Sequence, residues 1–135
     1  TSTAIGACVE TKNSILISGD ISFFYDSNAF WNNHVPANFK VIVINNGEGN
    51  IFKILPHPSK HEKSLPFFTT PNKTSIKKFC DLYNLNFYKV VSQAELAETF
   101  NKFTDNSTGP SVLEINTSQE DNDTILKEYF TYLKQ

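Results

Sequence analysis

The sequence contains no methionine, not even at position 1, and only two cysteines. We therefore expect an excised or processed piece of a longer protein, whose first helix begins upstream of Thr1. The opening residues have neither the basic flank nor the long apolar core of a secretory signal peptide. Cys8 and Cys80 fall in apolar segments with helical patterning, which is typical of small buried thiols rather than a disulfide or a metal site. This pattern favours a reducing cytoplasm as the location.

Strong charge of one sign and long apolar runs are also missing. The net charge is -2, with 19% charged and 39% apolar residues, so the composition supports neither disorder nor a polybasic surface for nucleic acid. The longest apolar runs have the length of strands, so we expect no membrane span. With 135 residues, the chain is long enough to form one domain over residues 1–135.

Short runs of apolar, mostly β-branched residues recur along the chain and predict buried strands. Such runs are typical of parallel strands that are covered on both faces. We expect strands over residues 14–19, 39–44, 87–91 and 111–115. Helical periodicity predicts helices over residues 1–11, 21–32, 76–83, 92–103 and from 121 onward. This alternation predicts an α/β fold with three layers, α/β/α, and a mainly parallel sheet.

Residues 21–32 contain five aromatic side chains, more than one side of a short helix normally buries: Phe23, Phe24, Tyr25, Phe30 and Trp31. Core packing explains some of them. We expect the others to be covered by a partner surface, because large exposed apolar patches usually mark contacts.

The segment over residues 56–72 contains four of the six prolines and predicts a long loop. Loops of this length are usually functional lids or segments ordered by a neighbour. His57, His61 and Glu62 have the spacing of metal ligands on a helix, but Pro58 disfavours a helix there. With no third ligand evident, the sequence does not favour a zinc site.

Oxygen-bearing side chains follow the first two predicted strands. Asp20 comes directly after the first and Asn46 two residues after the second, with 25 residues between them, which is enough for a helical crossover. In a parallel sheet, ligands bind beyond the carboxyl ends of the strands, so these side chains are expected to be neighbours. One carboxylate, one amide oxygen and a carbonyl from the following turn suit magnesium or calcium rather than zinc. A single carboxylate fits a metal–diphosphate site better than a cage built from protein alone.

The residues around Asp20 favour an anion next to this metal. Gly19 allows the backbone to approach a ligand closely, and the helix that follows begins with the backbone N–H groups of Ile21 and Ser22. An alternative stays open, in which Gly19-Asp20 and Asn45-Asn46 are only turn residues of a non-catalytic, doubly wound binding domain.

Gly19-Asp20, followed at this distance by Asn45-Asn46, resembles the motif of thiamine diphosphate enzymes. Most of that superfamily has glycine where this chain has Ile21, which argues against a pyruvate decarboxylase or acetohydroxyacid synthase type. Residues 19–29 and 45–56 are instead similar to the menaquinone-pathway family of 2-succinyl-5-enolpyruvyl-6-hydroxy-3-cyclohexene-1-carboxylate synthases. Residues 2–7 and 68–71 also resemble that family.

The resemblance implies the C-terminal, diphosphate-binding (PP-type) domain of such an enzyme, with thiamine diphosphate and magnesium, or manganese or calcium, as cofactors. The implied metal ligands are the side chains of Asp20 and Asn46 and the carbonyl of Glu48. Ile51 and Phe52 would line the cofactor and substrate pocket.

The resemblance also implies a reaction and partners. The family decarboxylates 2-oxoglutarate and adds the resulting carbanion equivalent to isochorismate. The glutamate that activates the cofactor and the basic residues that grip the substrates would lie before Thr1 or on a partner subunit, so this chain would contain no catalytic residue. We expect missing N-terminal domains, a homo-oligomer when the protein is full length, and an inactive isolated chain.

Overall fold

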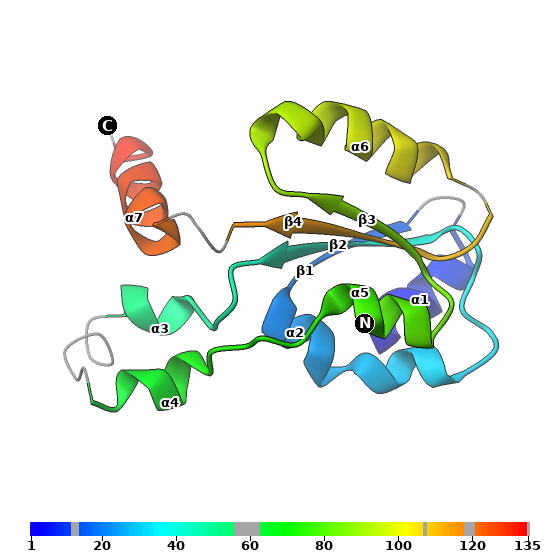
Figure 1. Cartoon of the computed structure of the whole chain (residues 1–135), viewed down its shortest axis with the longest axis horizontal. Helices are drawn as coiled ribbons and strands as arrows, with labels where there is room; N and C mark the ends of the chain where they lie inside the picture. The colour runs from blue at the N-terminus through cyan, green and yellow to red at the C-terminus, as the bar shows by residue number, and fades with distance from the viewer. Residues whose placement is uncertain (12–13, 56–62, 107, 118–120, 135) are drawn as a thin grey trace.

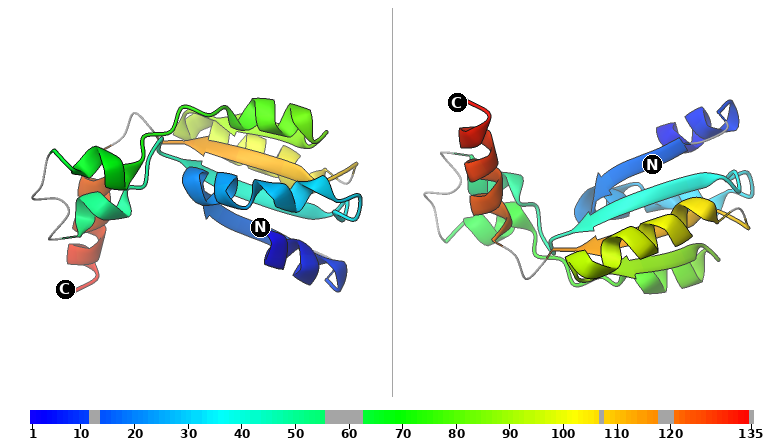
Figure 2. Two further views of the ribbon diagram at one scale, coloured as in Figure 1. Left: turned by 90° about the horizontal axis from the view of Figure 1, so that it is seen from below. Right: turned by 90° about the horizontal axis from the view of Figure 1, so that it is seen from above.

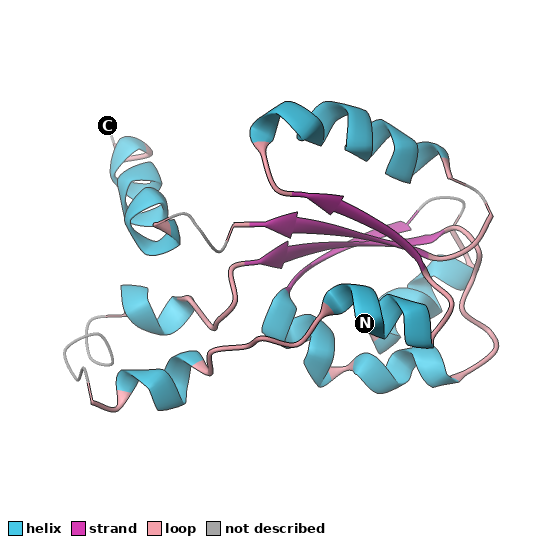
Figure 3. Cartoon of the chain, viewed as in Figure 1, coloured by secondary structure: helices cyan, strands magenta, loops and turns pink. Residues whose placement is uncertain are grey.

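A computed structural model describes residues 1–11, 14–55, 63–106, 108–117 and 121–134. Four parallel strands form one sheet in the order β1-β2-β4-β3. They are β1 (Ser14–Gly19), β2 (Phe39–Asn45), β3 (Asn86–Val90) and β4 (Ser111–Asn116). Each lies within one residue of its predicted range, and the central strands β2 and β4 carry the most deeply buried runs. The prediction of a parallel α/β sheet is confirmed (Figure 3).

Helices cover both faces of this sheet, giving the three predicted layers (Figure 1). One face carries the helices α1 (Ser2–Val9), α2 (Asp20–Tyr25) and α5 (Ile76–Leu82) and the 3₁₀ helix η1 (Ser27–Trp31). Their apolar side chains share one core with β2 and β4, around Phe23, Phe39 and Val41. The other face carries α6 (Gln93–Asp105), whose Phe103 packs against Ile42 and Leu113.

The helix predicted over residues 21–32 is two elements, which corrects that prediction. The helix α2 begins one residue earlier, at Asp20, and ends at Tyr25, because Asp26 leaves the helical conformation (φ −115°, ψ 36°). The Asp26 carboxylate accepts hydrogen bonds from the backbone N–H and the hydroxyl of Ser2, at 2.6 and 2.7 Å. This contact across 24 residues is not visible in the local pattern of the sequence.

The five aromatic side chains of this stretch separate into core and surface. Phe23 and Phe30 are buried and pack on each other and on Phe79 of α5. Tyr25 and Trp31 are 78% and 74% exposed. Core packing therefore accounts for part of the group, as predicted, and two large side chains stay on the surface.

The region predicted as one long loop contains a short helix, α4 (Leu65–Thr69), in its second half. Another short helix, α3 (Ile51–Ile54), precedes it. His57, His61 and Glu62 lie outside the described residues. The two helices contact each other through Phe52 and Phe68, whose ring centroids are 5.6 Å apart. Both lie beyond the carboxyl ends of the strands (Figure 1).

The last helix, α7 (Asn122–Tyr132), also lies beyond the strand ends and not over a face of the sheet (Figure 2). It contacts α3. Its predicted apolar stripe is present but largely exposed, with 37–59% of each side chain accessible at Ile125, Leu126, Tyr129, Phe130 and Leu133. Among the helices of the described residues, none has the length and apolar character needed to cross a membrane.

Both cysteines are free and buried, which confirms the prediction of buried thiols. Cys8 lies in α1 and Cys80 in α5, and both belong to the core around Phe23. Burial raises the pKa of the Cys80 thiol to about 12, so this thiol is neutral at ordinary pH.

Candidate functional site

The parallel pairing of β1 and β2 brings the two predicted site segments to one edge of the sheet. Gly19 at the end of β1 is in register with Ile44 of β2. Asp20 therefore leaves its strand beside the last residues of β2, directly before Asn46. The carboxyl ends of strands are where ligands bind in sheets of this type.

Asp20 is the first residue of α2 and is only 2% exposed. Burial raises the pKa of its carboxyl group, and the nearby Glu48 carboxylate raises it further. Hydrogen bonds from the Asn72 side chain and from the backbone N–H groups of Ile21 and Asp20 lower the pKa, but burial outweighs them. Among the described residues, no lysine forms an ion pair with Asp20. A cation at this carboxylate would offset the cost of its burial.

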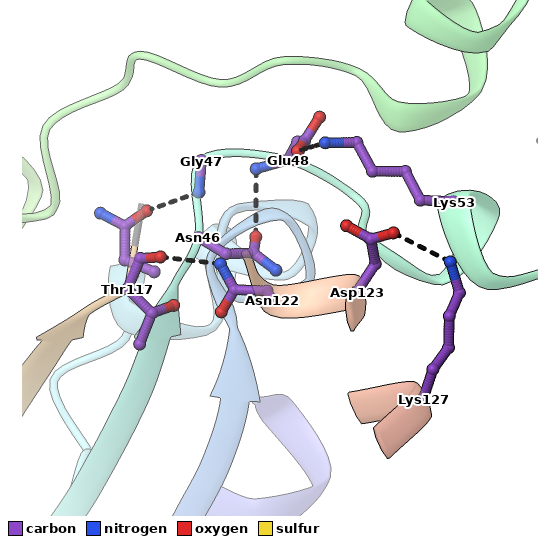
Figure 4. Close-up of polar contacts among 9 residues, drawn as sticks. Asn46, Gly47, Glu48, Lys53, Thr117, Asn122, Asp123 and Lys127 are labelled. Atoms are coloured by element: carbon purple, nitrogen blue, oxygen red, sulfur yellow. Dashed lines mark hydrogen bonds and ion pairs between the residues drawn. The ribbon is translucent and has the colours of Figure 1, made fainter. Parts of the chain in front are cut away.

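The turn after β2 is held by two consecutive hydrogen bonds between side chain and backbone (Figure 4). The Oδ1 atom of Asn45 accepts from the N–H of Gly47, and the Oδ1 atom of Asn46 accepts from the N–H of Glu48, both at 3.1 Å. Gly47 has φ +80°, in the left-handed region that favours glycine.

Asn72 joins the two halves of the site, and sequence reasoning missed it. Its backbone N–H donates to the carbonyl of Gly47 at 2.7 Å, and its Nδ2 atom donates to Oδ2 of Asp20 at 3.4 Å. Thr70, with φ +47°, ends α4 and turns the chain back toward the site. The only sequence signal was an amide directly after Pro71, which is ordinary turn chemistry.

The segment 65–72 therefore forms a wall of the site. The carbonyl of Thr69, a buried residue, accepts from the N–H of Gly49 at 2.5 Å. Together with the Asn72 contacts, this bond fixes the second half of the predicted loop against the turn after β2.

The side chain of Glu48 has a partner of its own beside the site. The carboxylate pairs with Nζ of Lys53 in α3 (Figure 4). With its carboxylate paired to Lys53, the part of Glu48 proposed for the metal is its main-chain oxygen, which the family resemblance implies and which stays a prediction.

Ile51 and Phe52, the two predicted lining residues, have different surroundings. Ile51 lines a hollow of about 470 Å³ between α3 and α7, and this hollow also includes Asn46. Phe52 packs against Phe68 of α4. Two hydrogen bonds connect the start of α7 to the site. Asn122 Nδ2 donates to the carbonyl of Thr117 at 2.7 Å. The N–H of Thr117 donates to the carbonyl of Asn45 at 2.9 Å.

The donors available at this edge are oxygen atoms: the Asp20 carboxylate, the Asn46 amide oxygen and the Glu48 carbonyl. The Asn46 oxygen already accepts one hydrogen bond, but an amide oxygen has a second lone pair. In the described part of the chain, no group of three His, Cys, Asp or Glu side chains could hold a metal. An oxygen-only set with one carboxylate fits a hard divalent cation that takes its remaining ligands from phosphate and water.

Comparison with known proteins gives the class of this domain. Residues 1–115 match the family model described as thiamine pyrophosphate enzyme, C-terminal TPP binding domain. The chain belongs to this family of thiamine pyrophosphate enzymes.

More particularly, the chain is similar to curated proteins named 2-succinyl-5-enolpyruvyl-6-hydroxy-3-cyclohexene-1-carboxylate synthase. It is 43% identical to the protein from Christiangramia forsetii, 46% to that from Flavobacterium psychrophilum and 40% to that from Flavobacterium johnsoniae, each over 134 residues. These matches cover 98% of this chain but only 23–24% of the relatives. The resemblance stated from the sequence is confirmed.

Proposed function

We propose that this chain is the diphosphate-binding domain of a 2-succinyl-5-enolpyruvyl-6-hydroxy-3-cyclohexene-1-carboxylate synthase, a transferase of menaquinone biosynthesis. The whole enzyme would decarboxylate 2-oxoglutarate and join the product to isochorismate. The observation that carries the proposal is the link from Asp20 through Asn72 to the turn at Gly47, which holds the two halves of an oxygen-only site together. The names of the relatives support this synthase, and the two substrates are those that the family resemblance implies.

In this proposal the residues of the chain bind and orient the cofactor. Asp20, Asn46 and the carbonyl of Glu48 hold magnesium, or manganese or calcium, on the diphosphate. Gly19 lets the backbone approach the diphosphate, and the N–H groups of Ile21 and Ser22 face its negative charge. Ile51 and Phe52 line the pocket. Thiamine diphosphate, when bound, supplies the carbanion chemistry.

The catalytic groups belong to other parts of the enzyme. We propose that N-terminal domains and a second subunit of a homo-oligomer supply the activating glutamate and the basic residues for the substrates. The isolated chain is then inactive. The cytoplasm remains the proposed location, because both thiols are free.

A thermal-shift titration of the longer protein with thiamine diphosphate and Mg²⁺ tests the proposal. A ligand at 100 times its Kd stabilises the folded state by about 2.7 kcal/mol, so a clear rise in Tm is expected only when both are present. Asp20→Ala should abolish the metal-dependent rise. Glu98→Ala, which removes an exposed carboxylate on α6, is the matched control and should retain it.

The absence of any Mg²⁺-dependent stabilisation in the longer protein would contradict the proposal and favour a non-catalytic binding domain. Turnover assays then test the substrates. Consumption of 2-oxoglutarate with isochorismate is expected. Consumption of pyruvate instead would show that the chain is the domain of a different thiamine-dependent enzyme. Turnover by the isolated chain would refute the proposed division of the active site.

A further inference from the structure

A second buried carboxylate lies near the site but touches none of the proposed metal ligands. Glu114 in β4 is 5% exposed. Its neighbours in register are Val43 of β2 and Lys89 of β3. A carboxylate at such a position needs hydrogen-bond and charge partners, because burying it without them is costly. Glu114 has one hydrogen-bond partner and one charge partner.

One partner is the side chain of Asn45. Its Nδ2 atom donates to Oε1 of Glu114 at 2.6 Å, a short bond to a charged acceptor. The other is Lys89, whose Nζ atom is 3.8 Å from Oε2 and supplies the opposite charge. Glu114 therefore bridges the outer strand β3 and the end of β2, where the turn of the site begins.

An ionised carboxylate can only accept hydrogen bonds, and this determines which way the Asn45 amide faces. Its NH₂ group must point to Glu114, so its oxygen points to the N–H of Gly47, where it accepts at 3.1 Å. The carbonyl of the same Gly47 accepts from Asn72, which in turn donates to Asp20. A continuous series of hydrogen bonds thus leads from Glu114 to Asp20.

We propose that Glu114 is a positioning residue for the metal site. It fixes the Asn45 amide and, through it, the turn from which Asn46 and the Glu48 carbonyl bind the metal. This inference rests on the proposed function, since the metal is the one held on the cofactor. Glu114 itself touches neither metal nor cofactor. Removing a side chain that hydrogen-bonds a metal ligand directly typically weakens metal affinity 10–100-fold, and Glu114 acts one residue further from the metal, so we expect a loss at the lower end of this range.

The test measures the Kd of Mg²⁺ by calorimetry in the longer protein at saturating thiamine diphosphate. Glu114→Ala should weaken Mg²⁺ binding about 10-fold. Glu114→Gln keeps an oxygen that can accept from Asn45, so it should restore most of the affinity. Ser111→Ala is the matched control, because Ser111 is a buried polar residue at the opposite end of the same strand. It should bind Mg²⁺ like the parent.

Asn45→Ala provides an independent variant that leaves β4 intact, in case Glu114→Ala does not fold. It should show the same loss of Mg²⁺ affinity. The double variant should be no worse than either single one, because both remove the same interaction. Retention of full Mg²⁺ affinity by Asn45→Ala would overturn the inference.

The outcomes separate this inference from the proposed function. A parent protein without Mg²⁺-dependent cofactor binding would overturn both. A parent that binds while Glu114→Ala binds equally well would overturn only the role of Glu114. Equal losses in Glu114→Ala and Glu114→Gln would also overturn it. The negative charge of Glu114 would then matter, and not the oxygen that accepts the hydrogen bond from Asn45.

Discussion

Burial of the ionised Asp20 carboxylate lowers the stability of the folded chain when no cation is bound. Because burial raises the pKa of Asp20, the folded state binds its proton more tightly than the unfolded state does. Stability is then highest when this carboxyl group is protonated and falls as the pH rises through its folded pKa. A bound cation would remove this penalty, so the site is least costly to the fold when it is occupied.

Asp20→Asn should therefore stabilise the metal-free chain at pH 7. The advantage should shrink as the pH falls and vanish below about 3.9, the ordinary pKa of aspartate, where both side chains are neutral. Urea unfolding of parent and variant across this pH range measures the difference. With Mg²⁺ and thiamine diphosphate present the order should reverse, because only the carboxylate binds the metal well. A variant less stable than the parent at pH 7 without metal would contradict the assignment.

At the scale of the elements, the strands could be predicted and some helices could not. Continuous β-branched runs such as residues 41–44 identify a strand because both faces are buried, and β2 and β4 bear this out. The break between α2 and η1 falls at Asp26, whose carboxylate contacts Ser2, and local periodicity contains no sign of this contact. The helix α4 escaped prediction because it occupies a proline-rich segment.

The site was predictable to a similar degree. Asp20 and Asn46 could be predicted as neighbours because they follow adjacent parallel strands, and the register of β1 with β2 brings them to one edge. Their binding of a metal stays a prediction. Asn72 and Glu114 could not. Each acts through a side-chain contact across 50 or more residues, 52 from Asn72 to Asp20 and 69 from Glu114 to Asn45.

The turn after β2 depends on the backbone of Gly47. Gly47→Ala should lower the free energy of unfolding by about 1–2 kcal/mol, the cost of a left-handed residue with a Cβ atom. The added Cβ would meet only the Asn72 carbonyl, at 3.8 Å, so backbone strain and not a clash accounts for the loss. Urea unfolding gives the value, and Gly47→Asn should lose less because asparagine tolerates this conformation.

Gly6→Ala is the control for this pair. It lies within α1 and a Cβ there meets nothing within 4 Å, so the change should stabilise the chain by about 0.5–1 kcal/mol. Equal effects at Gly6 and Gly47 would show that the left-handed turn is not present in solution.

At the scale of the whole molecule, large apolar side chains are exposed on α4, α7 and the outer strand β1. The stripe of α7 is exposed, and Phe67 and Phe68 lie at 86% and 48% exposure in α4. Ile15 and Ile17 are exposed on β1, an outer strand of the sheet. Patches of this kind usually mark contacts with other chains or domains.

The isolated chain should therefore self-associate in a concentration-dependent way, measurable by sedimentation velocity. Replacing Ile125 and Phe130 by lysine should reduce association while changing stability little, since neither side chain is buried. Ala97→Lys, which places the same charge at an exposed position of α6, is the control and should leave association unchanged. A parent chain that stays monomeric at all concentrations would refute the idea that these surfaces need a partner.

The strand order has a consequence for how the polypeptide reaches its native state. β3 precedes β4 in the chain but lies outside it in the sheet, so it cannot join the sheet until β4 has been synthesised. The central pair joins Lys40 to Ser111, a separation that slows folding because a long loop must close first. The ends of β1 and β2 can meet early. Glu114, which contacts Asn45 at the start of the turn after β2, is synthesised only with β4. A nascent chain would thus have Asp20 and Asn46, the proposed metal ligands, in place before Glu114 could contact the turn after β2 and hold it.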